Sequence, residues 1–152
     1  MPTSSIRGAV KLQLITIISA ALPGVQVVRG WPGNETQNEC VVMGRINGVS
    51  EIPQMAGPAN RYRRRDEWTI ELWFFALKQG QTADEAEDRV EAMFSAVDVA
   101  LSGPYGGPYL AGAVPGLQMC VIHESEGPES QMTLEGWSAS WRVTLACTAR
   151  LD

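Results

Sequence analysis

The segment from Asp66 to Gly103 constrains the fold more than any other part of the sequence, because it specifies one long strand followed by one helix. From Trp68 to Ala76 the even positions are apolar, and the odd positions up to Glu71 are polar. Apolar residues at every second position are typical of a strand with one buried face. The sequence therefore predicts a strand over Asp66–Lys78 whose even face belongs to the core.

The second half of this predicted strand is apolar on its odd face as well. The residues concerned are Trp73, Phe75 and Leu77. A strand that is apolar on both sides is covered on both sides. The cover can come from the protein's own helices or from a partner, and we interpret these three residues as candidates for a subunit interface.

The helix predicted over Thr82–Ser102 has clear start and stop signals. Thr82 and Glu85 have the spacing of a capping box, and the acidic first turns match the positive end of the helix dipole. Gly103 and Pro104 end the pattern. One face of this helix is apolar at i, i+3 and i+4 spacing, through Ala86, Val90, Met93, Phe94, Val97 and Leu101.

The N-terminal region predicts a second amphipathic helix, over about Ser4–Leu22 and ended by Pro23-Gly24. One side of it carries Val10, Leu14, Ile17, Ile18 and Ala21. Two basic residues before an apolar run, with Ser19-Ala20-Ala21 after it, also resemble a signal peptide. We expect the helix. The apolar run is too short to span a membrane, and we expect no membrane partner.

The other elements are read from alternation and from clusters of turn residues. Strands are predicted over 25–31, 39–46, 117–124 and 132–149, with a bend near 136, and an acidic turn over 124–131. Residues 48–65 and the Gly/Pro/Tyr-rich residues 103–116 are predicted loops. The order α-β-β-β-α-β-β predicts an α+β fold with one mostly antiparallel sheet of about five strands and both helices on one face. Short links suggest antiparallel pairing for the first two strands and for the last two.

Length and composition favour a single domain, 1–152, that lives inside an assembly. The formal net charge of −5 argues against general affinity for nucleic acid, which depends on neutralising phosphates. There are ten arginines but only two lysines, and there are five tryptophans. Arginine and tryptophan are enriched in protein interfaces, and lysine is depleted there.

No set of residues predicts catalysis, a metal site or a cofactor. His123 is the only histidine, and we read it as a solvated residue at a strand end rather than a general base. Residues 136–140 resemble a nucleophile elbow but lack its second glycine. Cys40, Cys120 and Cys147 are far apart and predict buried, reduced thiols. We therefore expect a protein that is not an enzyme.

One polar cluster stands out at the end of the predicted 48–65 loop: Arg61, Tyr62, Arg63, Arg64 and Arg65. These arginines can meet phosphates or an acidic surface of another chain, or they can pair locally with Asp66 and Glu67. The acidic helix start and the acidic 124–129 segment lie elsewhere in the chain. Opposite charges on separate parts of one subunit suit a head-to-tail contact that closes into a ring. Our hypothesis is that the cluster reaches a neighbouring subunit or the next ring.

The layout as a whole resembles the tail terminator proteins of long-tailed (siphovirus-type) bacteriophages. The segments that carry this resemblance are 24–27, 30–32, 41–44, 66–70, 82–90 and the closing alternating strand. The resemblance implies a homohexameric ring that caps the tail tube, ends its polymerisation and joins the tail to the head connector. The implied partners are further copies of the chain, the major tail tube protein and the head–tail connector protein.

The resemblance also implies a location and excludes some roles. The protein would sit at the head-proximal end of the tail in the virion, and in the host cytoplasm during assembly. Genomic DNA would pass through the lumen without specific binding, and no catalytic residues are implied. The alternatives are another head–tail joining or tail tube protein of the same virion and, from other classes, a small cytosolic enzyme or a monomeric binding module.

Overall fold

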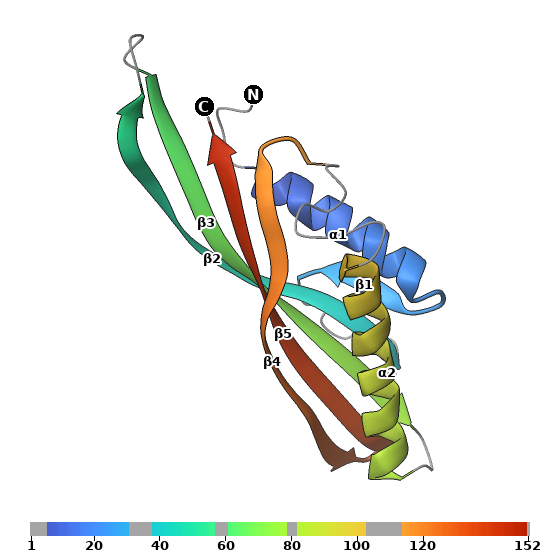
Figure 1. Cartoon of the computed structure of the whole chain (residues 1–152). Helices are drawn as coiled ribbons and strands as arrows, with labels where there is room; N and C mark the ends of the chain where they lie inside the picture. Colours follow the sequence, from blue (N-terminus) through green and yellow to red (C-terminus); the bar gives the residue numbers. More distant parts are fainter. Residues whose placement is uncertain (1–5, 31–37, 57–60, 79–81, 103–113, 152) are drawn as a thin grey trace.

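The computed structural model describes residues 6–30, 38–56, 61–78, 82–102 and 114–151, and Figure 1 shows their arrangement. Two helices and five strands follow one another in the predicted order α-β-β-β-α-β-β. The elements are α1 (Arg7–Ala21), β1 (Gln26–Arg29), β2 (Glu39–Ala56), β3 (Arg61–Lys78), α2 (Ala83–Ser102), β4 (Leu117–Thr133) and β5 (Gly136–Leu151). The α+β class is confirmed.

The strands form one open, mixed sheet in the order β1-β2-β3-β5-β4. The pairs β2–β3, β3–β5 and β4–β5 are antiparallel, as predicted for the last two strands. The predicted antiparallel pairing of the first two strands is wrong, because β1 runs parallel to β2 with Val27 opposite Val41. The segment between Arg29 and Glu39 is long enough to return past a four-residue strand, so the short link does not force a hairpin.

The second correction concerns residues 48–65, which were predicted to form a loop. Most of this segment is a β-hairpin, because β2 continues to Ala56 and β3 already begins at Arg61. Ser50 pairs with Asp66, and a register shift lies between Glu51 and Gln54. Pro53 falls inside that shift, where a missing N–H is tolerated. Pro53 therefore marks an irregularity in a strand rather than its end, and Gly48 pairs regularly with Trp68.

The third correction concerns the acidic turn predicted over 124–131. This segment belongs to β4, which runs without interruption to Thr133, and the turn to β5 spans Thr133 to Gly136. Thr133 closes the turn: its Oγ1 donates to the Gly136 carbonyl at 2.7 Å and accepts from the Glu135 N–H at 3.2 Å. The irregularity predicted near Gly136 lies instead between Glu126 and Glu129, where the register shifts.

Both helices pack on one face of the sheet, and the core lies between them and the strands (Figure 1). The predicted even face of β3 is buried throughout, from Trp68 to Ala76. Phe94 of α2 stacks on Trp141 at 4.8 Å and meets Phe74 edge-on at 6.2 Å. The buried helix residues are Val10, Leu14, Ile17 and Ile18 of α1, with Ala86, Val90, Met93, Val97 and Leu101 of α2. Each fully buried large apolar side chain stabilises the fold by roughly 1.5–3 kcal/mol.

The two helices are anchored differently at their N-termini. At α2 the Glu85 N–H donates to Thr82 Oγ1 at 3.4 Å, which is one half of the predicted capping box. No side chain caps α1. Instead the Arg7 guanidinium donates from Nη2 to Asp66 Oδ1 at 2.9 Å and from Nε to Oδ2 at 3.3 Å. It also lies 5.6 Å from the ring centroid of Trp68.

The Arg7–Asp66 pair lies beside the point where the β2–β3 hairpin leaves the rest of the sheet. Asp66 is only 1% exposed, and Arg7 compensates the charge of this buried carboxylate. Gly48 of β2 passes close to this pair. A Cβ there would lie 2.6 Å from the carbonyl oxygen of Glu67, so a side chain at this position would force the hairpin backbone to shift.

Candidate assembly surface

The face of the sheet that points away from the helices carries an apolar region on β2 and β3. Trp73 and Phe75 stack in parallel, with ring centroids 6.0 Å apart and planes 7° apart, and both are partly exposed. On the neighbouring strand, Val42 lies opposite Trp73 and Cys40 lies opposite Phe75. Opposite residues of an antiparallel pair share a face, and Cys40 and Val42 are fully buried there. The structure therefore places apolar side chains on the second face of β3, as the pattern predicted.

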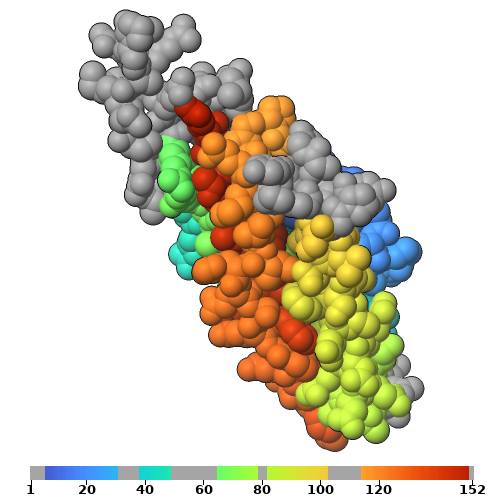
Figure 2. Space-filling model, in the orientation of Figure 1, coloured from blue at the N-terminus to red at the C-terminus, as the bar shows by residue number. Residues whose placement is uncertain are grey.

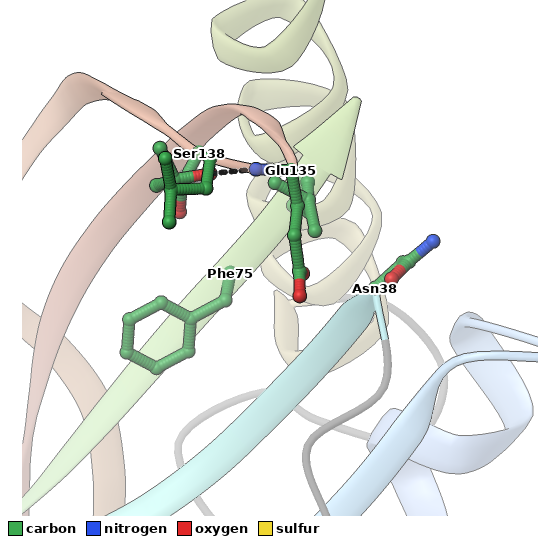
Figure 3. A pocket seen from close by; sticks show the side chains of 8 residues that line it. Asn38, Phe75, Glu135 and Ser138 are labelled. Atoms are coloured by element: carbon green, nitrogen blue, oxygen red, sulfur yellow. Dashed lines mark hydrogen bonds between the residues drawn. The ribbon is translucent and has the colours of Figure 1, made fainter. Parts of the chain in front are cut away.

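A hollow of about 440 Å³ continues this region toward the β4–β5 turn (Figure 3). Phe75 and Leu77 line it on β3, and Asn38, Thr133, Glu135 and Ser138 contribute its polar groups. Leu134, which lines the hollow, is fully exposed, and the nearby Met132 is 71% exposed. The full lining is Asn38, Phe75, Ala76, Leu77, Thr133, Leu134, Glu135 and Ser138. One carboxylate among mostly neutral groups gives this hollow no acid–base pair, and it is better suited to receiving an apolar side chain.

The same open face becomes charged on β5 and β4. Arg142 stands opposite Trp73 on one side and Glu126 on the other. Its guanidinium lies 2.7 Å from Glu126 and 3.5 Å from Glu71, and 5.9 Å from the ring centroid of Trp73. Arginine thus bridges the aromatic pair and the acidic strand β4.

The predicted arginine cluster, Arg61 to Arg65, forms the first residues of β3, at the tip of the hairpin. Arg65 pairs with Glu67 at 2.8 Å, and both side chains are about half exposed, which confirms the local pairing for this one arginine. The side chains of residues 61–64 lie outside the described ones. Trp73, Phe75 and Leu77 lie at the other end of the same strand. The structure therefore separates the two groups of candidate interface residues.

The remaining chemistry-bearing residues do not converge. Among the described residues no three His, Cys, Asp or Glu side chains are placed to hold a metal ion. His123 is exposed on β4, and Ser138 and Ser140 lie inside the regular strand β5, not at an elbow. The part of the chain that the structure describes has no helix of the length and apolarity needed to cross a membrane.

All three cysteines are free and buried, as predicted. Sequence reasoning missed that two of them meet: Cys120 of β4 lies opposite Cys147 of β5, and the Cys147 thiol donates to Cys120 Sγ at 3.3 Å. This hydrogen bond, together with burial, raises the pKa of Cys147. The signal in the sequence was limited to Cys147, which falls on the apolar face of a predicted strand.

No protein-family model matches this chain, and no curated protein sequence matches it either. Its structure, however, matches a chain of a solved structure described as "Virion of native gene transfer agent (GTA) particle". The TM-score is 0.59 at 12% sequence identity, and the match covers 96% of this chain and 98% of the other. At this identity the match shows a shared fold, and it extends over the whole architecture of both chains.

Proposed function

We propose that this protein is a structural component of a phage-like virion and that it acts there as the tail terminator. The observation that carries the proposal is the fold shared, from end to end, with a chain of a gene transfer agent virion. The resemblance of the sequence to tail terminators adds the specific role. In that role six copies form a ring that caps the tail tube, ends its polymerisation and docks onto the head connector.

The surface described above supports an assembly role rather than catalysis. A stacked aromatic pair on an open sheet face, next to a hollow and an exposed leucine, suits contact with another protein. Apart from the two buried thiols of Cys120 and Cys147, the described residues that could do chemistry lie apart from one another. We therefore assign Trp73, Phe75 and Leu77 to a contact with a neighbouring subunit.

The arginine cluster takes the second assembly role. Arg61, Tyr62, Arg63, Arg64 and Arg65 lie at the tip of a long hairpin, the part of the fold that extends farthest beyond the helices (Figure 1). We assign this tip to a contact with a neighbouring subunit or the next ring, where arginine can bind carboxylates. The net charge of −5 keeps affinity for DNA low, which suits a lumen through which the genome passes.

The deciding experiment adds the purified protein to assembling tail tubes and locates it by electron microscopy, with native mass spectrometry of the free protein alongside. The expected result is a six-membered ring at one end of each tube and an arrest of tube growth. A strict monomer at high concentration that binds no tube end would overturn the proposal. Copies found along the tube would make it a tail tube protein, and copies found only at the head connector would make it a joining protein.

The hairpin assignment has its own test, Arg63→Glu combined with Arg64→Glu. We expect this variant to fold, because both substitutions lie at the hairpin tip, but to cap fewer tubes. Lys78→Glu is the matched control for a reversed charge elsewhere on β3. Capping and oligomer mass equal to those of the unmodified protein would remove the arginine cluster from the interface while leaving the ring itself standing.

A further inference from the structure

The edge of the sheet formed by β1 carries a group of cations, Lys11, Arg29 and Arg45, which we call the cationic edge. Arg29 is the last residue of β1, and Lys11 of α1 donates from Nζ to the Gly44 carbonyl at 3.2 Å. Arg29 lies opposite Met43, and Lys11 bonds the next residue, Gly44, so these two cations lie close together. Burial and the charge of Arg29 lower the pKa of Lys11. Arg45 follows in the register shift between Met43 and Ile46 and is exposed.

No ion pair within the described residues involves Lys11, Arg29 or Arg45. Within the described ranges, the ion pairs are made by other arginines: Arg7, Arg65, Arg89 and Arg142. Arg29 is exposed, like Arg45. Like charges held close together repel one another, and an anionic partner would remove that cost.

The solvent side of α2 is acidic. The exposed carboxylates of α2 include Asp84, Asp88, Glu91 and Asp98, whose spacing of three, four and seven residues places them along one ridge. Figure 2 shows α2 and β4 side by side on one face of the molecule. The exposed Glu124, Glu126 and Glu129 of β4 lie opposite Thr144, Arg142 and Ser140 of β5, so they belong to the open face of the sheet and not to this ridge. We call this ridge on α2 the anionic face.

Few cations neutralise the anionic face from within the chain. Arg89, the one basic residue of α2, is turned to Glu39 of β2. Arg142 forms its ion pairs with Glu126 and Glu71 on the open face of the sheet. The ridge on α2 therefore remains negatively charged, and its electrostatic potential attracts a positively charged partner.

The two surfaces lie toward opposite edges of the sheet, since the cationic edge lies at β1 and α2 packs on β3, β5 and β4. Another copy is not expected to add a strand at the edge formed by β4. This strand carries three register shifts, Pro128 and several glutamates, which disfavour pairing with another strand. A contact there uses side chains. Each surface also has an exposed apolar residue beside its charges: Leu12, 56% exposed, follows Lys11, and Val99, 70% exposed, follows Asp98.

We propose that the cationic edge of one copy binds the anionic face of the next copy, and that this is the lateral contact of the ring. The inference rests on the proposed function only in taking a second copy as the partner. A contact between two different surfaces of the same chain is heterologous, and repeating it with a fixed rotation closes a ring. Leu12 and Val99 supply apolar contact area, and the charges fix the orientation of the subunits.

Two variants that reverse charge test this contact. Variant one is Arg29→Glu with Arg45→Glu, and variant two is Asp88→Lys with Glu91→Lys. Each leaves like charges facing each other, so we expect at least about a tenfold loss of oligomer relative to the unmodified protein by native mass spectrometry at low salt. Circular dichroism checks that each variant is folded.

Two restorations provide the matched controls. An equimolar mixture of the variants should form alternating oligomers, because each contact then joins opposite charges. The fourfold variant, with both edges reversed, should assemble alone. Recovery in both confirms the contact, and two folded variants that stay monomeric in the mixture and in the fourfold chain overturn it.

The outcomes also separate this inference from the proposed function. If the unmodified protein forms rings on tubes and both variants do so equally well, the proposed contact is wrong and the terminator role stands. If the unmodified protein forms no ring, alone or on tail tubes, the terminator role falls and the lateral contact falls with it.

Discussion

The two faces of strand β3 differ in how far their side chains are buried. The even side chains from Trp68 to Ala76 are all buried under the helices, whereas Trp73, Phe75 and Leu77 on the odd face remain partly exposed. Both sets are apolar, so hydrophobicity alone does not distinguish them. What distinguishes them is cover, because the helices lie on one face only (Figure 1). The face under the helices therefore supplies most of the stability of the subunit, and the other face stays partly exposed.

Two adjacent phenylalanines give the sharpest test of this comparison. Phe74→Ala empties a fully buried site that meets Phe94, and we expect a loss of about 3–5 kcal/mol in the free energy of unfolding. Phe75→Ala removes a ring stacked on Trp73 at the open face and should cost only about 1 kcal/mol. Urea denaturation of both variants measures the difference, and equal losses would show that the two faces are equally part of the core.

A neighbouring pair of acidic residues tests the comparison at the other end of β3. Asp66→Ala leaves Arg7 without its buried carboxylate and should destabilise the protein by about 1–3 kcal/mol. Glu67→Ala is the matched control, because Glu67 is half exposed and its pair with Arg65 is worth about 0–1 kcal/mol. If the control costs as much as Asp66→Ala, the anchoring role of the Arg7–Asp66 pair is wrong.

Trp73→Ala should separate folding from assembly. The partly exposed ring contributes about 1 kcal/mol to the subunit through its stack on Phe75, so the variant should fold. Under the proposed function it should cap fewer tail tubes than the unmodified protein. Tube capping counted by electron microscopy measures this, and normal capping by a folded Trp73→Ala protein would show that the open face is not an interface.

The smallest effect is expected at Arg142. Arg142→Ala removes two ion pairs and a contact with Trp73, but all three lie at a partly solvated surface. Surface pairs of this kind contribute about 0–1 kcal/mol, less at high salt. Thermal unfolding at low and high salt should therefore show a small difference that shrinks as salt is added. A large and salt-independent loss would mean that Arg142 is part of a buried network.

The sequence was sufficient for the parts of the fold that repeat a period. Alternation in β3 and β5 and the apolar stripes of α1 and α2 identified the core, because burial of one face imposes the period on the sequence. The shared structure with a virion chain agrees with this architecture. The apolar second face of β3 was also visible, since Trp73, Phe75 and Leu77 break the alternation.

The wrong predictions arose where loops and turns were assigned from amino-acid composition without knowledge of strand pairing. Residues 48–56 contain glycine and proline, yet they pair with β3 across a register shift that accepts Pro53. The glutamates of β4 looked like a turn, but the strand is an edge whose one face is solvated, where charge is tolerated. The cationic edge was not predictable either, because Lys11, Arg29 and Arg45 come together only when β1 runs parallel to β2.

The two facing thiols of β4 and β5 allow the opening of this edge of the sheet to be measured. Cys147 stays protonated, because its hydrogen bond to Cys120 and its burial both raise its pKa, and a protonated buried thiol is a poor nucleophile. An alkylating reagent therefore labels this pair only when β4 separates from β5. The labelling rate therefore reports how often that edge strand opens. It can be measured in the free subunit and in the assembled particle without any substitution.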